Sequence, residues 1–213
     1  MRRKERAMSE SSEQARVSAG DVFTQSLVPK LQRHPKRIVF TDGADERVLR
    51  VAVRMVESKV GIPILLGNRD EIYRLASDRG ISLDFVKVLD PSTAGDFEVF
   101  CEFLRRTEHV RGVEISNAEE ILRQPAYFGA MMIQYGQADG LIGGNQSYPS
   151  AIFRALLHLV KPVPSVPRVF SVAILSAQHL SHFGREGVLF LADCGLNEEL
   201  SSKQLAAIAV ETG

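Results

Sequence analysis

The alternation of apolar and amphipathic segments between residues 37 and 89 constrains the fold more than any other feature of this sequence. Three short apolar runs, each followed by a turn rich in Gly, Asp or Pro, predict buried strands at residues 37–41, 62–66 and 85–89. The segments between them place apolar residues at helical spacing, most clearly over residues 45–56. Such alternation predicts an α/β fold in three layers, a mostly parallel sheet with helices on both faces.

A further strand, turn and helix pattern at residues 138–160 contains the strongest candidate for a binding site. Ser147, Pro149 and Ser150 signal the start of the helix, with serine expected as its cap and Pro149 in its first turn. A helix start presents free N–H groups and partial positive charge, and Arg154 follows Ser150 by one turn on the same helix face. The pattern predicts a site for phosphate or a carboxylate, formed by Gly144, Asn145, Ser147, Ser150 and Arg154.

On the glycine turn alone, a purely structural βα loop would be the preferred interpretation, and Ser150 with Arg154 shifts the balance toward an anion site. The turn is not a P-loop, since no GK[ST] follows it. The acidic residues 42, 45 and 46 are interpreted as the start of a helix rather than as a paired-carboxylate site. Cys194 is interpreted as a buried, unreactive cysteine rather than as a nucleophile. The five histidines have no metal-ligand spacing, so no metal site is predicted.

Composition excludes several classes of protein. A net charge of zero over 213 residues argues against general nucleic-acid or membrane-surface binding. The two cysteines form no CxxC pair, no apolar run could span a bilayer, and no secretory signal opens the chain, so we expect a cytoplasmic protein. The absence of GxGxxG argues against a dinucleotide-dependent oxidoreductase.

The remaining pattern suggests three parts: a polar tail over residues 1–20, a first α/β domain over 21–115 and a second over 116–213. Ser116 and Ser201 are expected to cap helices in the second domain. Strands are expected near residues 169–175 and 188–191.

Five segments between Arg37 and Val210, taken in order, resemble the phosphate acetyltransferase and phosphate butyryltransferase family. They are RIVFTDGADERVLRVA, IPILLGN, NAEEILRQPAYFGAMMIQYGQADGLIGG, FLADCGLN and QLAAIAV. The resemblance implies transfer of an acetyl group between coenzyme A and inorganic phosphate, with no bound cofactor or metal and with acetyl-CoA as a substrate. It also implies a homodimer of two-domain α/β chains, with the active-site cleft between the domains.

For individual residues the resemblance implies less. Arg154 matches the family's arginine in an S-x-x-x-R helix, and either Arg105 or Arg106 matches a second arginine. The run at residues 147–151 departs from the hydroxyl-rich pattern of active members and is more similar to the related domain of some malic enzymes. A noncatalytic acyl-CoA-sensing or assembly domain is therefore the alternative function.

The family's chains continue well beyond residue 213, and their later part carries the serine, arginine and aspartate assigned to catalysis. No catalytic residue is therefore assigned here, and the chain is expected to be incomplete. A sheet edge or helix face would then be left uncovered, which predicts poor solubility or association.

Overall fold

The structure is a computed structural model, and it describes residues 19–106, 117–163, 166, 168–177, 181–185 and 187–213. Its backbone contacts divide the chain into two compact units, residues 30–161 and residues 1–29 with 162–213. The predicted domain boundary between residues 115 and 116 falls at the edge of a segment outside the described residues. The domains 21–115 and 116–213 therefore stay a prediction.

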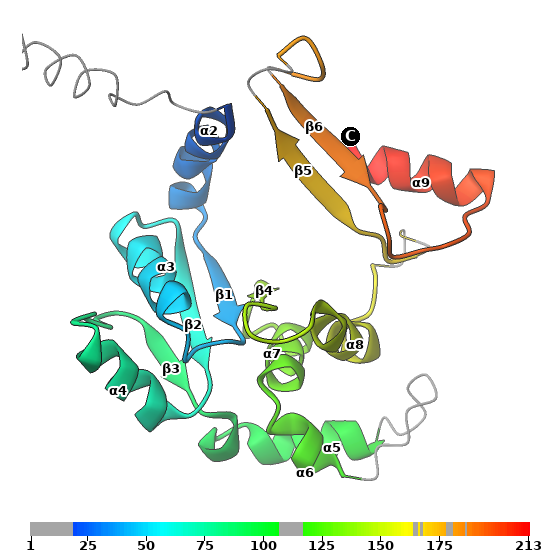
Figure 1. The fold of residues 1–213 in the computed structure, drawn as a ribbon. Coiled ribbons are helices and arrows are strands. Elements are labelled where there is room, and N and C mark those ends of the chain that lie inside the picture. Colours follow the sequence, from blue (N-terminus) through cyan, green and yellow to red (C-terminus); the bar gives the residue numbers. More distant parts are fainter. Residues whose placement is uncertain (1–18, 107–116, 164–165, 167, 178–180, 186) are drawn as a thin grey trace, which may run out of the picture. The chain divides into compact units, whose positions relative to one another are not determined.

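The unit of residues 30–161 is built on a parallel sheet of four strands in the order β3–β2–β1–β4 (Figure 1). The strands are β1 (Lys36–Phe40), β2 (Gly61–Leu66), β3 (Lys87–Leu89) and β4 (Gly140–Ile142). All four were expected from the apolar runs. The third begins later than predicted, because Phe85 has a φ of 65°, which a strand does not accommodate.

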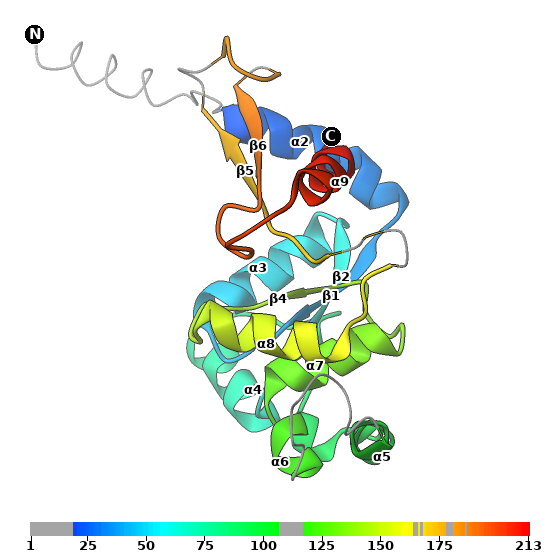
Figure 2. The ribbon, with the colours of Figure 1, turned by 90° about the vertical axis from the view of Figure 1, so that its right-hand side faces the viewer.

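Helices cover both faces of this sheet, which confirms the predicted α/β fold (Figure 2). Neighbouring strand residues point to opposite faces: Leu65 packs with α3 and α4, whereas Leu66 packs with α5 to α8. The first pair is α3 (Glu46–Glu57) and α4 (Arg69–Asp78). The second group is α5 (Phe97–Arg106), α6 (Ala118–Leu122), α7 (Pro125–Gln134) and α8 (Pro149–Leu159), and a short 3₁₀ turn (Pro91–Thr93) follows β3.

Most predicted helix starts are correct, and two predicted caps are not. Pro149 lies at the start of α8 as predicted, but its N-cap is Tyr148, without a side-chain capping bond. Ser147 lies one residue too early to reach the first free N–H groups, so the predicted cap is wrong. Helix α6 is capped by Asn117, whose Oδ1 accepts the Glu120 N–H, rather than by Ser116, which lies outside the described residues.

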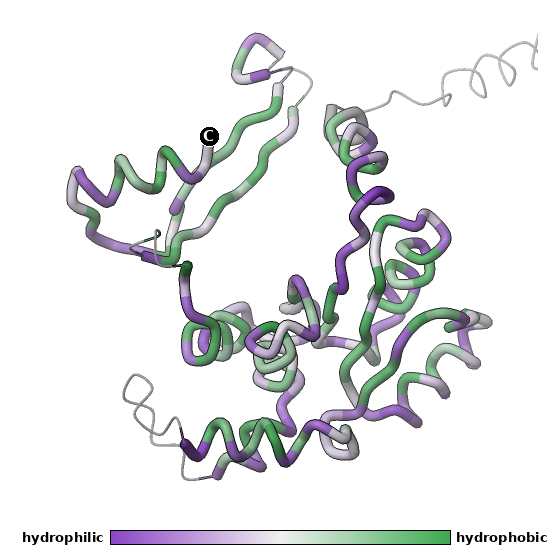
Figure 3. Tube along the Cα trace, turned by 180° about the vertical axis from the view of Figure 1, so that it is seen from behind, coloured by the Kyte–Doolittle hydropathy of each residue, from purple (hydrophilic) through white to green (hydrophobic). Residues whose placement is uncertain are grey.

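The other unit contains an antiparallel pair of strands, β5 (Val172–Ser176) and β6 (Val188–Ala192), followed by α9 (Ser202–Thr212). Helix α2 (Ala19–Arg33) begins in this unit, and its Phe23 ring lies edge-on to that of Phe190, with centroids 6.5 Å apart. Ser201 caps α9 with a complete capping box, as predicted. Both strands are strongly apolar (Figure 3). All five residues of β5 are nevertheless exposed, as are two of the five residues of β6.

Cys194 also departs from its prediction, because it is exposed rather than buried. It follows Asp193, whose φ of 53° turns the backbone out of β6, and no side chain of the described residues encloses the thiol. The buried cysteine is instead Cys101 on α5, and burial raises the pKa of its thiol. Among the helices of the described residues, none has the length and apolar content needed to cross a membrane.

Candidate functional site

Strand β4 lies at the edge of the sheet beside β1. The two strands end side by side, and their turns form the candidate site. The chain leaves β1 toward β2 through α3, whereas β4 pairs with the opposite edge of β1. Phe40 and Ile142 are partners in the register, and the Thr41 N–H donates to the Ile142 carbonyl at 3.0 Å. Open α/β sheets bind ligands at the carboxyl ends of strands where the order reverses in this way.

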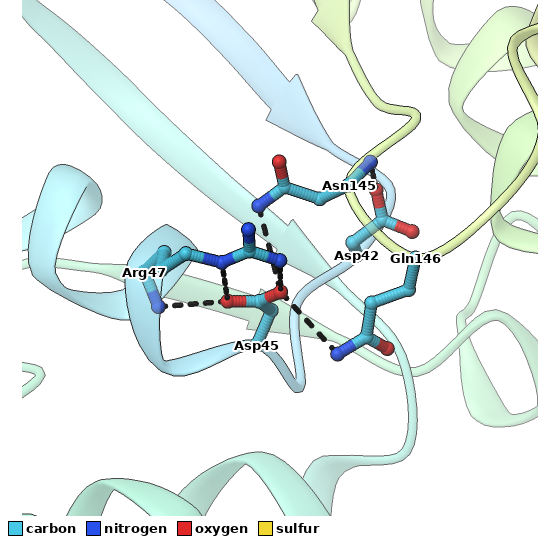
Figure 4. A network of polar contacts seen from close by, with 5 residues as sticks. All are labelled: Asp42, Asp45, Arg47, Asn145 and Gln146. Carbon is cyan, nitrogen blue, oxygen red and sulfur yellow. Dashed lines mark hydrogen bonds and ion pairs between the residues drawn. The ribbon is translucent and has the colours of Figure 1, made fainter.

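Two carboxylates from the turn after β1 hold the turn after β4 in place (Figure 4). The backbone N–H of Asn145 donates to Oδ2 of Asp42 at 2.9 Å. The side-chain amides of Asn145 and Gln146 approach Oδ2 of Asp45 at 3.5 and 3.3 Å. These contacts join residues about a hundred positions apart in the sequence, so the shape of one turn depends on the other.

Asp45 is the electrostatic centre of this arrangement. It is only 5% exposed, and it caps α3 by accepting the Arg47 backbone N–H at 2.8 Å. The Arg47 guanidinium donates to both carboxylate oxygens, at 3.1 Å from Nε and 2.7 Å from Nη2. These bonds from Arg47 lower the pKa of Asp45 to about 2. Asp45 is therefore ionised at neutral pH, and its charge fixes the orientation of Arg47.

Glycine is required in the turn after β4 for two separate reasons. A Cβ on Gly143 would lie 2.2 Å from Thr41 Oγ1 and 2.7 Å from Ile152 Cδ1, so a side chain there has no room. Gly144 has a φ of 94°, a conformation that side chains disfavour. The glycine pair lets the turn lie directly on β1 and on the first turns of α8.

The start of α8 suits an anionic group. Its N-cap residue, Tyr148, makes no side-chain capping bond, and Ser150 and Arg154 on its first two turns are exposed. Two hydroxyls next to the turn, Thr41 Oγ1 and Ser147 Oγ, are buried and have no hydrogen-bond partner among the described residues. Because buried polar groups are normally satisfied, these hydroxyls are candidates for contacts with a ligand.

The structure gathers five of the seven predicted site residues on one segment, namely Gly144, Asn145, Ser147, Ser150 and Arg154. Arg105 and Arg106 lie instead at the end of α5, where they form ion pairs with Glu119 and Glu102. The predicted role of these two arginines in substrate binding stays a prediction.

Sequence reasoning missed Asp42, Asp45, Arg47 and Gln146 as members of the site. The acidic pair was assigned to a helix start alone, and Asp45 does cap α3. Its second role depends on the pairing of β1 with β4, which no local pattern reveals.

A pocket of about 260 Å³ opens between these turns. Its lining residues are Phe40, Asp42, Arg47, Val48, Val51, Ile142, Gly143 and Asn145. The wall is largely apolar, with one fixed guanidinium, one carboxylate and one amide. Over the described residues, no group of three or more His, Cys, Asp or Glu side chains is placed to hold a metal ion.

Fold and site together define an α/β protein with a ligand-binding edge where the strand order of a parallel sheet reverses. The family model for phosphate acetyl/butaryl transferase matches residues 22–213, and the chain belongs to this family. The resemblance read from the five sequence segments is therefore confirmed.

Curated relatives carry the name phosphate acetyltransferase. The protein from Thermoanaerobacterium thermosaccharolyticum is 30% identical over 188 residues, which is 88% of this chain and 56% of the relative. That from Bacillus subtilis is 32% identical over 192 residues, 90% of this chain and 57% of the relative. Among solved structures, the EutD phosphotransacetylase from Staphylococcus aureus superposes with a TM-score of 0.75 at 29% identity, covering 91% of this chain and 56% of that one.

The chain thus spans about half the length of the curated relatives named above. The fold of the solved relative agrees with the parallel sheet and covering helices found here.

Proposed function

We propose that this chain takes part in acyl transfer between coenzyme A and inorganic phosphate, and that the start of α8 binds the phosphate group. In this reaction a phosphate oxygen attacks the thioester carbonyl, a C–O bond forms and the C–S bond breaks. Acetyl-CoA and phosphate become acetyl phosphate and CoA, whose thiolate takes up a proton. The names of the relatives favour this activity over a noncatalytic sensing domain.

The observation that carries the proposal is the uncapped start of α8, with Arg154 one turn further along the helix. Backbone N–H groups and a guanidinium together attract a phosphate dianion, and they orient its attacking oxygen. The unpartnered hydroxyls of Thr41 and Ser147 can donate two further hydrogen bonds. The same donors would stabilise negative charge that develops during transfer. We assign no residue of this chain as the general base.

The test measures CoA-dependent formation of acetyl phosphate by the wild type and by Arg154→Ala. We expect activity to fall by about 100-fold, as for loss of one transition-state donor. Arg74→Ala is the control, since it removes an exposed arginine from α4, far along the chain from the turn, and should leave activity unchanged.

Phosphate binding provides a second readout that does not depend on turnover. Arg154→Ala should weaken binding of inorganic phosphate by about tenfold, as expected for one charge-assisted hydrogen bond. Equal phosphate affinities in wild type and Arg154→Ala would exclude this site.

On the basis of the family, we also propose that the protein forms a homodimer, that it is cytoplasmic, and that acetyl-CoA and acetyl phosphate are its substrates. Light scattering coupled to size exclusion chromatography tests the dimer. Comparison of acetyl-CoA with longer acyl-CoA thioesters tests the acyl preference.

A further inference from the structure

We propose that the pocket between Arg47 and Ile142 binds an adenine ring. The inference rests on the proposed function insofar as the ring belongs to coenzyme A. The pocket shares Asn145 with the anion site, whereas Arg47, Val51 and Ile142 do not belong to that site. The pocket of about 260 Å³ lies just below the range of about 300–1,000 Å³ typical of sites that enclose a whole drug-sized ligand. It therefore fits one ring system of a larger ligand.

The charge of the pocket argues against a phosphate and for a neutral ring. Arg47 contributes one positive charge, but Asp45 neutralises it through two side-chain hydrogen bonds, and Asp42, which also lines the pocket, adds a negative charge. The three groups sum to one negative charge, which repels an anion. This contrasts with the start of α8 next to it, where Arg154 has no carboxylate partner among the described residues.

The shape and polarity of the walls favour adenine over an acyl chain. The bonds to Asp45 hold the Arg47 guanidinium in a fixed plane (Figure 4), and such a plane stacks well on an aromatic ring. Val51 and Ile142 are 51% and 53% exposed and offer apolar contact to the ring faces. One oxygen of Asp42 is engaged by the Asn145 N–H, and the other can accept from an exocyclic amino group.

The position of the pocket also fits a nucleotide. Asn145 lines it, and the same turn runs on through Ser147 into the start of α8. A neutral ring site and an anion site thus lie at the two ends of one short turn. A base in the first would direct its ribose and phosphates toward the second.

The test compares binding of CoA, 4′-phosphopantetheine, adenosine, AMP and inorganic phosphate by calorimetry. The critical variant is Val51→Trp, which fills the pocket from an exposed helix position. Val99→Trp is the matched control, because Val99 is also a helical valine that is 51% exposed but does not line the pocket. We expect Val51→Trp to weaken CoA and adenosine by about tenfold, consistent with loss of base stacking, and to leave 4′-phosphopantetheine and phosphate unchanged.

Arg47→Lys gives an independent check, because lysine keeps the positive charge but lacks the planar guanidinium group that would stack on the ring. It should weaken adenosine more than phosphate. Adenosine affinity that is the same in the wild type, Val51→Trp and Arg47→Lys would overturn the proposal. If AMP binds as tightly as CoA, the ring recognised belongs to a free nucleotide; if CoA binds more tightly, the ring is that of the substrate.

The outcomes separate this proposal from the proposed function. Adenine-dependent binding without formation of acetyl phosphate would retain the pocket and contradict the activity of this chain. Acetyl phosphate formation that is insensitive to Val51→Trp would retain the activity and reject the pocket.

Discussion

Strands β2 and β5 have equally apolar sequences, GIPILL and VAILS, but opposite surroundings. Five of the six residues of β2 are buried, whereas all five residues of β5 are exposed. β2 lies inside a four-stranded sheet with helices on both faces, whereas among the described residues β5 has only β6 as a strand partner. An apolar run therefore predicts a strand well. It also indicates that the strand should be buried, but it does not show which elements bury it.

The largest expected difference between the two units concerns aromatic side chains. Phe128 on α7 is 1% exposed and its ring centroid lies 5.2 Å from that of Phe100, whereas Phe190 on β6 is 49% exposed. Phe128→Ala should lower the free energy of unfolding by about 3–5 kcal/mol, because it leaves a cavity in a packed core. Phe190→Ala should cost about 1 kcal/mol, since water already reaches its ring.

Urea denaturation of the three proteins measures both values. A loss for Phe190→Ala as large as that for Phe128→Ala would mean that the β5–β6 pair is covered in solution. In that case size exclusion chromatography should reveal association of the wild type, as the exposed strands predict.

Two glycines sharpen the same comparison at the level of the backbone. Gly143→Ala should cost about 1–3 kcal/mol and weaken phosphate binding, because its new methyl group meets Thr41 and Ile152 in a packed turn. Gly195 follows β6, has no heavy atom within 4 Å of an added Cβ and no positive φ. Gly195→Ala should change stability by less than about 0.5 kcal/mol. Equal losses at the two positions would show that the turn after β4 is looser than the structure indicates.

The local elements of both units could be predicted from sequence because their causes are local. Asp45 and Ser201 precede helices as caps, and Pro149 opens α8. The errors are also local: Ser147 lies one residue before the cap position, and Phe85 carries a positive φ inside an apolar run.

The candidate site could be predicted only in part. Ser150 and Arg154 follow from a helix pattern, because they lie on one segment of the chain. Asp42 and Asp45 could not be connected with Asn145, because their contacts depend on β1 pairing with β4 across about a hundred residues. The antiparallel pairing of β5 with β6 was missed for the same reason, since apolar runs do not specify strand direction.

Asp45 makes the stability of the parallel unit depend on pH. Its pKa in the folded chain is about 2, below the ordinary value of 3.8, so its stabilisation is present above that value and is lost as the pH falls toward 2. The shift alone would correspond to about 2 kcal/mol, and exposure of the Arg47 side chain to solvent reduces this to about 1 kcal/mol.

The measurement compares urea midpoints of the wild type and Asp45→Asn at about pH 6 and about pH 3. The wild type should be the more stable at the higher pH, and the difference should shrink at the lower pH, because asparagine does not titrate. A difference that is the same at both pH values would contradict an ionised Asp45 as the source of the effect.

The smallest expected effect concerns two helix caps, and here the two units should behave alike. Asn68 accepts the Glu71 N–H at 3.0 Å at the start of α4, and Ser201 accepts the Gln204 N–H at 3.4 Å at the start of α9. Asn68→Ala and Ser201→Ala should each reduce the protection of their own helix in hydrogen exchange by about 0.5–1 kcal/mol. A cap acts only on the first turn of its helix. The burial of the neighbouring sheet should therefore not change how much the cap contributes to protection. A much larger effect at Ser201 would mean that the packing of α9 on β6 depends on this cap. The different exposure of the strands in the two units would then depend in part on one helix cap.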